Sequence, residues 1–333
     1  MTPDEGKNVL GKNILEVEGL VQYFDQTKPF LERLLTRAPK RRVHAVNRIA
    51  FNIREGEVFS LVGESGCGKS TTARAIVRLL KPQEGRIVFE GQDIARLDQR
   101  QLLPIRPRMQ MIFQNPYASL DPRQKVGEMI MEPLLFHKLA ADRKEARRRM
   151  LDLMETIGLH PEQADRYPHQ FSGGQRQRLG IARALATYPR LVVADEPVSA
   201  LDVSVQAQIL NLMMDLRQRL GLTCLFIAHD LSVVRHISDR VAIMYLGFIV
   251  EQGCRDDIFD SPLHPYTEAL LASAPSLEKR SIHVPLSGDV PSPLDLPAGC
   301  AFASRCPRKI TRCAEERPQL REFGGRQVAC HLV

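Results

Sequence analysis

The sequence predicts an α/β fold built on a mainly parallel sheet with flanking helices, and three observations carry this prediction. Leu191–Ala194 and Leu222–Ala228 are short apolar runs with the length of buried strands. Between them, Val205–Leu220 places its apolar residues at helical spacing. A glycine-rich turn separates the run that ends at Val62 from a helical segment that starts at Ser70 and extends to Lys81-Pro82. Strands that alternate with helices in this way pair in parallel, because each connection crosses the sheet.

The remaining segments complete the expected organisation. Ile14–Val21 and Val43–Ile53 have the patterns of strands, with a polar insertion at Asp25–Arg42 between them. Residues 127–159 are rich in helix-forming residues and predict a helical subdomain inserted between strands. From Ser261 onward, prolines interrupt every long pattern, so we expect the tail to be a separate module of turns and short elements.

Composition limits where the chain acts. No segment is apolar over the roughly 20 residues that a membrane-spanning helix needs, and the most apolar stretch, Val241–Val250, predicts one buried strand. The N-terminal residues lack the pattern of a signal peptide, so we expect a cytoplasmic chain. The net charge is +7, but the basic residues are scattered and accompany no nucleic-acid-binding motif, so we expect no nucleic-acid partner.

The glycine-rich turn matches the phosphate-binding pattern G-x-x-x-x-G-K-S over residues 63–70. Glycines let main-chain amides wrap around phosphates, and the N-terminus of the following helix adds positive potential. In this pattern Lys69 reaches the β- and γ-phosphates of a nucleotide, and the Ser70 hydroxyl is a ligand of Mg²⁺. The other candidate nucleotide contacts in this loop are Gly63, Glu64, Ser65, Gly66, Cys67, Gly68 and Thr71.

Two acids at the end of a buried strand supply what nucleotide hydrolysis further requires. Asp195 is the candidate carboxylate ligand of Mg²⁺, and Glu196 is the candidate general base for the attacking water. Two adjacent acids can also simply end a strand in a turn. Their occurrence together with a phosphate-binding loop favours the chemical interpretation.

Further motifs resemble those of ABC ATPases and occur in the order typical of that family. The signature motif is matched with Phe171 in place of the usual leucine, followed by Ser172, Gly173, Gly174 and Gln175. The Q-loop, D-loop and switch histidine of the family are matched by Gln114, Ser199–Asp202 and His229. The resemblance implies an ABC ATPase domain over residues 14–255, with antiparallel N-terminal strands and a helical subdomain at about 115–180.

The resemblance also assigns roles. In such ATPases two subunits face head to tail, and each ATP lies between the phosphate loop of one subunit and the signature motif of the other. Ser172, Gly173, Gly174, Gln175 and Asp202 would thus serve the site across the dimer. Gln114 would serve both Mg²⁺ and catalysis, and His229 would be catalytic. Phe24 is the best match for the aromatic that stacks on adenine, with Tyr23 as the alternative.

The tail and two internal motifs are similar to those of peptide-importer ATPases, especially the second ATPase subunit of dipeptide importers. Ser261–Thr267 contains their His-Pro-Tyr motif, which we interpret as a packed turn and a family marker. The resemblance implies a peripheral subunit at the cytoplasmic face of the inner membrane, bound to two permeases. A second, homologous ATPase subunit is expected rather than a homodimer, and a periplasmic or lipid-anchored peptide-binding protein would act through the permeases.

Two alternative functions stay open. One is the same role in a related importer, for example of nickel or glutathione, because an ATPase subunit does not touch the transported substrate. The other is a soluble ABC protein of DNA repair or translation. Such proteins usually carry two ATPase units in one chain or a long coiled coil, and this sequence predicts one unit and no coiled coil.

Four of the seven cysteines lie in the tail, at Cys300, Cys306, Cys313 and Cys330. Disulfides are not expected in a reducing cytosol, and four thiolates can hold Zn²⁺ or an iron–sulfur cluster. The family resemblance suggests a 4Fe–4S cluster, with zinc and free buried thiols as alternatives. We therefore expect residues 256–333 to form a regulatory, metal-binding module. We also expect loss of one of these cysteines to leave the ATP affinity of the phosphate loop little changed.

Overall fold

Two sheets organise the chain. The computed structural model describes residues 11–26, 41–115, 120–273 and 288–333. The larger sheet has the strand order β11-β12-β10-β9-β3-β8-β7-β6, and the smaller has the order β2-β1-β4-β5. The strands of the larger sheet are β3 (Val58–Val62), β6 (Met109–Ile112), β7 (Leu191–Asp195), β8 (Thr223–Ala228), β9 (Arg240–Tyr245), β10 (Phe248–Cys254), β11 (Arg321–Phe323) and β12 (Arg326–Val328).

The central strands of the larger sheet are parallel, which confirms the predicted fold class. Strand β3 pairs in parallel with β8 and β9, and β7 pairs in parallel with β6 and β8. The prediction of one strand over Val241–Val250 was wrong. Strands β9 and β10 form an antiparallel hairpin there, because Leu246 and Gly247 both have positive φ angles and make a two-residue turn.

The smaller sheet is antiparallel and comprises β1 (Asn13–Asp25), β2 (Arg42–Arg54), β4 (Glu84–Phe89) and β5 (Gln92–Asp93). Strand β1 is longer than predicted because it follows β2 as far as the pairing of Asp25 with Arg42. The guanidinium of Arg42 donates to the Asp25 carboxylate at 3.0 Å. Most of the predicted polar insertion, residues 27–40, lies outside the described residues.

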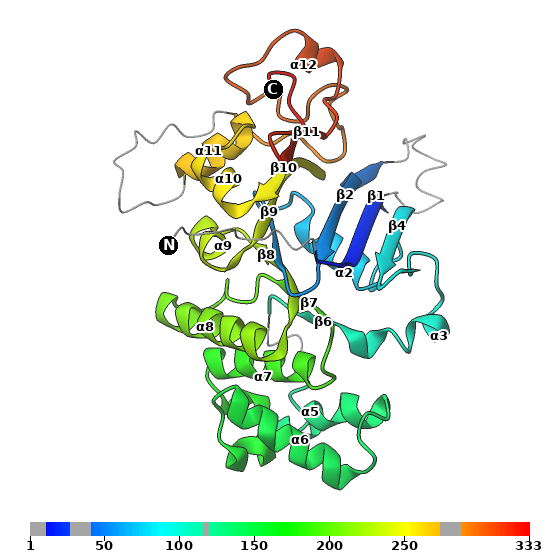
Figure 1. The fold of residues 1–333 in the computed structure, drawn as a ribbon, viewed down its shortest axis with the longest axis vertical. Coiled ribbons are helices and arrows are strands. Elements are labelled where there is room, and N and C mark those ends of the chain that lie inside the picture. Colours follow the sequence, from blue (N-terminus) through cyan, green and yellow to red (C-terminus); the bar gives the residue numbers. More distant parts are fainter. Residues whose placement is uncertain (1–10, 27–40, 116–119, 274–287) are drawn as a thin grey trace, which may run out of the picture.

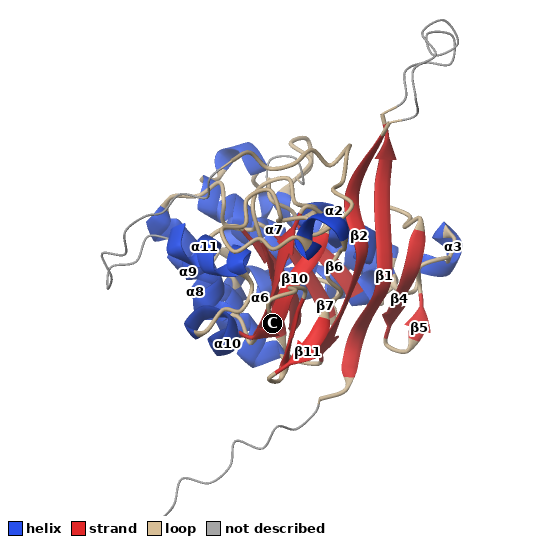
Figure 2. Cartoon of the chain, turned by 90° about the horizontal axis from the view of Figure 1, so that it is seen from above, coloured by secondary structure: helices blue, strands red, loops and turns tan. Residues whose placement is uncertain are grey.

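Helices cover both faces of the larger sheet (Figure 2). Helix α2 lies between the two sheets, and its apolar side chains share one core with both of them. Helices α8 to α11 cover the opposite face, where a second core forms. The helix bounds are α2 (Lys69–Ile76), α3 (Gln99–Leu102), η1 (Arg106–Arg108), α5 (Val126–Phe136), α6 (Arg143–Thr156), η2 (Pro161–Asp165), η3 (Pro168–Gln170), α7 (Gly173–Leu185), α8 (Val203–Leu220), α9 (Leu231–Ile237), α10 (Arg255–Asp260), α11 (Pro265–Ser273) and α12 (Arg312–Glu315).

The inserted helical subdomain has a core of its own. Helices α5, α6 and α7 pack together below the sheet in Figure 1. Met129, Met150, Met154 and Leu179 are buried between them. No helix in the described ranges is both long enough and apolar enough to cross a membrane.

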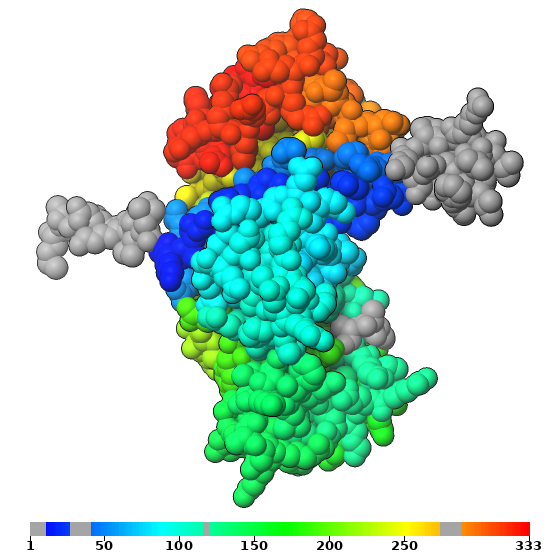
Figure 3. Space-filling model, turned by 90° about the vertical axis from the view of Figure 1, so that its right-hand side faces the viewer, coloured from blue at the N-terminus to red at the C-terminus, as the bar shows by residue number. Residues whose placement is uncertain are grey.

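The tail shares structure with the ATPase sheet instead of standing apart from it. Strands β11 and β12 form a hairpin, and β12 pairs with β10. Phe302 is buried in the second core, with its ring 5.3 Å from that of Tyr245 and 5.4 Å from that of Tyr266. The main chain of the tail also contacts β2, since the His44 amide in β2 donates to the Pro293 carbonyl of the tail at 2.9 Å. Figure 3 shows the tail lying over the N-terminal strands.

Candidate functional site

The phosphate-binding loop connects β3 to α2 and encloses the side chain of Lys69. The Lys69 ammonium donates to the carbonyls of Gly63 at 2.7 Å and Glu64 at 2.9 Å, and the residue is 4 % exposed. Cys67 is also buried, with its sulfur 3.7 Å from the same ammonium, and burial raises the pKa of its thiol. Ser65 is exposed at the tip. The loop thus holds its one lysine inside a ring of main chain, and main-chain amides of such a loop form the concavity that binds an anion.

Two glycines let this loop lie directly against neighbouring strands. Gly68 precedes α2 with φ +106°, and a Cβ there would stand 2.0 Å from the carbonyl oxygen of Ala45 in β2. A Cβ on Gly63 would stand 2.1 Å from the carbonyl oxygen of Met244 in β9. No side chain fits at either position, so both glycines are required by contact with β2 and β9.

A candidate Mg²⁺ site forms where α2 meets the end of β7. The Ser70 hydroxyl donates to the Asp195 carboxylate at 2.8 Å. Asp195 is 1 % exposed, and this burial raises the pKa of its carboxyl, an effect that the Ser70 hydroxyl partly opposes. A hydroxyl and a carboxylate oxygen side by side are the hard ligands that Mg²⁺ takes from a protein, so these two residues fit the ion.

The three predicted catalytic side chains meet at one edge of the sheet. The Gln114 amide donates to the Glu196 carboxylate at 2.9 Å, and His229 Nδ1 lies 3.2 Å from the same carboxylate oxygen. Each residue follows a parallel strand: β6, β7 or β8. Glu196 has a φ of +46°, and its amide donates to the Ile227 carbonyl at 3.0 Å, which fixes this strained conformation.

The signature residues lie apart from the phosphate loop, at the start of α7. The Ser172 hydroxyl accepts from the Gln175 amide, and the Gln175 side chain accepts from the Ser172 amide, so the pair forms a capping box. Gly174 packs against α8, where an added Cβ would stand 2.4 Å from Val205. Within the described residues, no hydrogen bond or ion pair joins residues 172–175 to the phosphate loop. Asp202 is exposed at the start of α8, and its side chain caps no amide there.

Of the two candidate adenine-stacking aromatics, Phe24 is the more accessible. It is 39 % exposed near the end of β1. Tyr23 is covered by the guanidinium of Arg42, which lies 4.5 Å from the ring centroid. The assignment of Phe24 to adenine stacking stays a prediction.

The His-Pro-Tyr motif is a buried turn that begins α11. His264 is 1 % exposed, and its Nδ1 accepts from the Tyr266 amide at 3.0 Å. Burial lowers the pKa of His264 to about 4, so the ring is neutral and can accept. The amides of Leu263 and His264 donate to the carboxylate of Glu251 in β10. The motif therefore fixes the tail to the edge of the ATPase sheet.

Sequence reasoning missed two residues of the tail that contact the phosphate loop. The guanidinium of Arg305 binds the carboxylate of Glu64, and the hydroxyl of Tyr266 accepts from the Glu64 amide. Arg305 and Glu64 are 241 positions apart in the chain, and no local pattern marks a contact at such a separation.

The four tail cysteines gather in one region. Cys313 and Cys330 are buried, whereas Cys300 and Cys306 are half-buried. Burial raises the pKa of the Cys300 thiol, and the three other thiols raise it further, so all four are electrostatic neighbours. The Cys300 amide also donates to the Cys313 carbonyl at 2.8 Å. Nevertheless, over the residues that the structure describes, no group of three or more metal-binding side chains has the geometry to hold an ion.

Known proteins match the chain over nearly its whole length. The family model described as ABC transporter matches residues 46–199, and that of the oligopeptide/dipeptide transporter C-terminal region matches residues 250–313. The dipeptide transport ATP-binding protein of Escherichia coli K12 is 49 % identical over 316 residues, which are 94 % of each chain. The chain belongs to the ATP-binding proteins of the oligopeptide/dipeptide ABC transporter family. An oligopeptide transport ATP-binding protein of Bacillus subtilis 168 is 48 % identical over 327 residues, covering 96 % of this chain and 98 % of that protein.

Solved structures agree with this membership. A dimeric ATP-binding cassette in a post-hydrolysis state, bound to ADP and Pi, superposes with a TM-score of 0.63 at 30 % identity. The match covers 72 % of this chain and 98 % of that one, so this ABC ATPase has segments beyond the shared cassette. As a member of the family, the chain binds ATP and hydrolyses it in support of transport.

Proposed function

We propose that this ABC ATPase powers the import of dipeptides or oligopeptides from the cytoplasmic face of the inner membrane. The observation that carries the proposal is the combination of a full ATP-hydrolysing cluster with a C-terminal region of the oligopeptide/dipeptide type on one chain. The names of its relatives as dipeptide and oligopeptide transport proteins support that substrate class. Import of nickel or glutathione is the alternative, since the ATPase subunit does not contact the cargo.

The proposed roles follow from the contacts. Lys69 neutralises the phosphates inside the loop, and Ser70 with Asp195 holds Mg²⁺. Glu196 accepts the proton of the attacking water, and His229 and Gln114 hold its carboxylate in place through one shared oxygen. Gln114 would turn from Glu196 toward Mg²⁺ when the nucleotide is bound.

The signature residues complete the site of a facing subunit. Ser172, Gly173 and Gly174 stand at a helix N-terminus, where main-chain amides and the helix dipole favour the γ-phosphate. Their position away from the chain's own phosphate loop supports a head-to-tail dimer, and a dimeric cassette is among the similar structures. We propose that a second, homologous ATPase subunit is the partner, and that a peptide-binding protein delivers cargo to two permeases.

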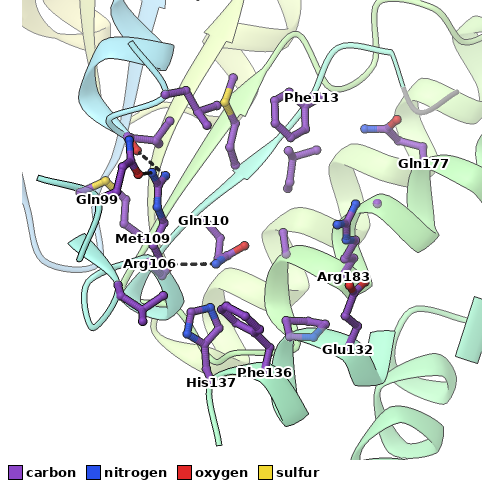
Figure 4. A pocket seen from close by; sticks show the side chains of 18 residues that line it. Gln99, Arg106, Met109, Gln110, Phe113, Glu132, Phe136, His137, Gln177 and Arg183 are labelled. Atoms are coloured by element: carbon purple, nitrogen blue, oxygen red, sulfur yellow. Dashed lines mark hydrogen bonds between the residues drawn. The ribbon is translucent and has the colours of Figure 1, made fainter. Parts of the chain in front are cut away.

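A groove between the sheet and the helical subdomain is the proposed docking site for the permeases. It has a volume of about 640 Å³ and extends from η1 and β6 to α5 and α7. Figure 4 shows Arg106 on one wall, Gln177 and Arg183 on the other, and Phe136 at the lower end. Four large apolar side chains exposed at its rim are Leu79, Leu103, Phe113 and Phe136. Such a concentration of exposed apolar surface is typical of a protein–protein interface, and a short permease helix would fill the groove.

We expect the isolated chain to hydrolyse ATP slowly and the rate to rise at least about tenfold when permeases and partner ATPase are added, because each site is shared. The assembled transporter in vesicles should take up a labelled dipeptide in an ATP-dependent manner.

Phe136→Ser should abolish the stimulation of ATP hydrolysis by the permeases without changing ATP binding. Tyr188→Ser is the matched control, because Tyr188 is similarly exposed, at 61 % against 66 %, and lies outside the groove.

Two outcomes would contradict these placements. Crosslinks from the permeases to residues 300–330, with none to the groove, would refute the docking site. Uptake of nickel or glutathione in place of peptides would keep the ATPase role and replace the cargo.

We further propose that Cys300, Cys306, Cys313 and Cys330 hold a metal centre, most simply a 4Fe–4S cluster, with a structural or regulatory role. Four thiols are the ligand type that such a cluster takes, and the Cys300 thiol is influenced electrostatically by the other three, although the described side chains do not stand in coordinating positions. Binding a metal centre would draw the thiols together and add metal affinity to the stability of the tail. Zn²⁺ would use the same four thiolates.

Protein purified without oxygen should contain iron and acid-labile sulfide, and Cys330→Ser should lose most of both and loosen residues 295–333 toward proteases. Cys254→Ser is the matched control, because Cys254 is exposed and outside the cluster. One zinc per chain would favour the alternative metal. Metal-free protein with four alkylatable thiols and a protease-resistant tail would end the proposal.

A further inference from the structure

The tail reaches into the ATP site through one arginine. Arg305 Nη1 donates to one carboxylate oxygen of Glu64 at 2.8 Å, and Nη2 donates to the other at 3.1 Å. Glu64 is the second residue of the phosphate-binding loop, directly after Gly63. The two parallel hydrogen bonds fix the side chain of Glu64 in direction as well as position, which a single lysine contact would not do.

The contact is built into the protein core. Arg305 is 8 % exposed and also donates to the Tyr245 hydroxyl at 3.5 Å. Its Nε is buried without a hydrogen-bond partner among the described residues, so the side chain is held there at some cost. Phe302, three positions earlier, anchors the same segment in the core. Arg305 is the buried partner and Glu64 is half-buried, so removing Arg305 alone would leave the Glu64 carboxylate without its counter-charge in a partly desolvated position.

A second contact from the tail holds the main chain of the same loop residue. The hydroxyl of Tyr266 accepts from the Glu64 amide at 3.0 Å. Tyr266 is fully buried, and its ring packs against those of Tyr245 at 4.7 Å and Phe302 at 5.4 Å between centroids. The side chain and the amide of Glu64 are thus both fixed by residues beyond position 260.

We infer that Arg305 and Tyr266 are positioning residues for the phosphate loop, so that the affinity for ATP depends on the C-terminal tail. The inference rests on the proposed role of the loop as the ATP site. Without Arg305, the carboxylate of Glu64 would stand unneutralised beside the negative phosphates. Without both contacts, the loop would have to become ordered when the nucleotide binds, which weakens binding. The tail is therefore not independent of the loop, in contrast to the expectation from sequence.

The test is the dissociation constant of MgATP for the full-length chain, measured by calorimetry. Arg305→Ala should weaken binding about tenfold, and Arg305→Lys should restore part of the loss, because the charge returns without the second hydrogen bond. Arg308→Ala is the matched control. Arg308 lies in the same segment and also flanks Cys306, but it pairs with Glu268 on α11 and not with the loop. The affinity of the Arg308→Ala protein for MgATP should therefore equal that of the wild type.

A double-mutant cycle of Arg305 and Glu64 distinguishes a role in positioning the phosphate loop from general damage to the fold. In the Arg305→Ala background, Glu64→Gln should recover at least about threefold in affinity, since it removes the unneutralised charge. Loss of structure alone would not be repaired by a second substitution. If Arg305→Ala does not fold, Tyr266→Phe keeps the packed ring and removes only the acceptor, and it should weaken binding about threefold.

The outcomes that overturn the inference are distinct from failure of the ATP site itself. Lys69→Ala should abolish binding in every background. If it does so while Arg305→Ala and Tyr266→Phe bind MgATP as the wild type does, the loop is the ATP site and the tail does not position it. If Lys69→Ala binds normally, the proposed site is wrong and the inference falls with it.

Discussion

Glu196→Gln should reduce ATP turnover in the assembled transporter by about 100-fold or more, because the amide cannot accept the proton of the attacking water. ATP binding should be retained, since Lys69, Ser70 and Asp195 are unchanged. Glutamine keeps the volume of the side chain and an oxygen within reach of the Gln114 amide, 2.9 Å away. The closed, ATP-bound dimer should therefore accumulate, which size-exclusion chromatography with MgATP would show.

Asp230→Asn is the control for a general effect of charge at this edge of the sheet. Asp230 follows His229 directly, but its carboxylate caps α9 by accepting from the Ser232 amide at 2.8 Å, and asparagine caps equally well. Turnover of this variant should stay near that of the wild type. Turnover of Glu196→Gln at the wild-type rate would exclude Glu196 as the general base.

Gly68→Ala should lower the free energy of unfolding by about 3 kcal/mol and abolish ATP binding, since it combines a left-handed residue with overpacking. The added Cβ would stand 2.0 Å from the Ala45 carbonyl oxygen, so either β2 or the start of α2 must move. Gly66→Ala is the matched control in the same loop. Gly66 also has a positive φ, at +80°, but an added Cβ would meet nothing within 4 Å.

The comparison separates backbone strain from steric contact. Urea unfolding should show a loss of about 1–2 kcal/mol for Gly66→Ala, which is the cost of the left-handed conformation alone. Equal losses for both variants would mean that the contact with β2 does not limit the loop.

The meeting of the three candidate catalytic side chains could be predicted from sequence because the signals are local. Gln114, Glu196 and His229 each come directly after a short apolar run, and the carboxyl ends of parallel strands meet at one edge of a sheet. The phosphate loop carries a pattern of its own between a strand and a helix. In each case, a few neighbouring residues contain the whole prediction.

Where the sequence was misleading, contacts from distant segments decided the outcome. The helix predicted to reach Lys81-Pro82 ends at Ile76, and Arg78 adopts a φ of +58° although neither glycine nor proline marks the stop. The buried guanidinium of Arg78 donates to the carbonyls of Leu80, Ile94 and Leu97. A continuation of α2 through Arg78 would not allow these contacts. Arg305 was overlooked for the same reason, since its partner belongs to the opposite end of the chain.

The hairpin of β11 and β12 has a consequence for the solubility of the protein. Strand β10 would otherwise be the last strand of the large sheet, with unpaired amides and carbonyls that another chain could add to. Strand β12 covers it at Glu251 and Gln252, and the new outermost strand, β11, is only three residues long and begins with Arg321 and Glu322. Short, charged outer strands are poor templates for aggregation. We therefore expect the β11–β12 hairpin also to hinder cross-β association between copies of the chain.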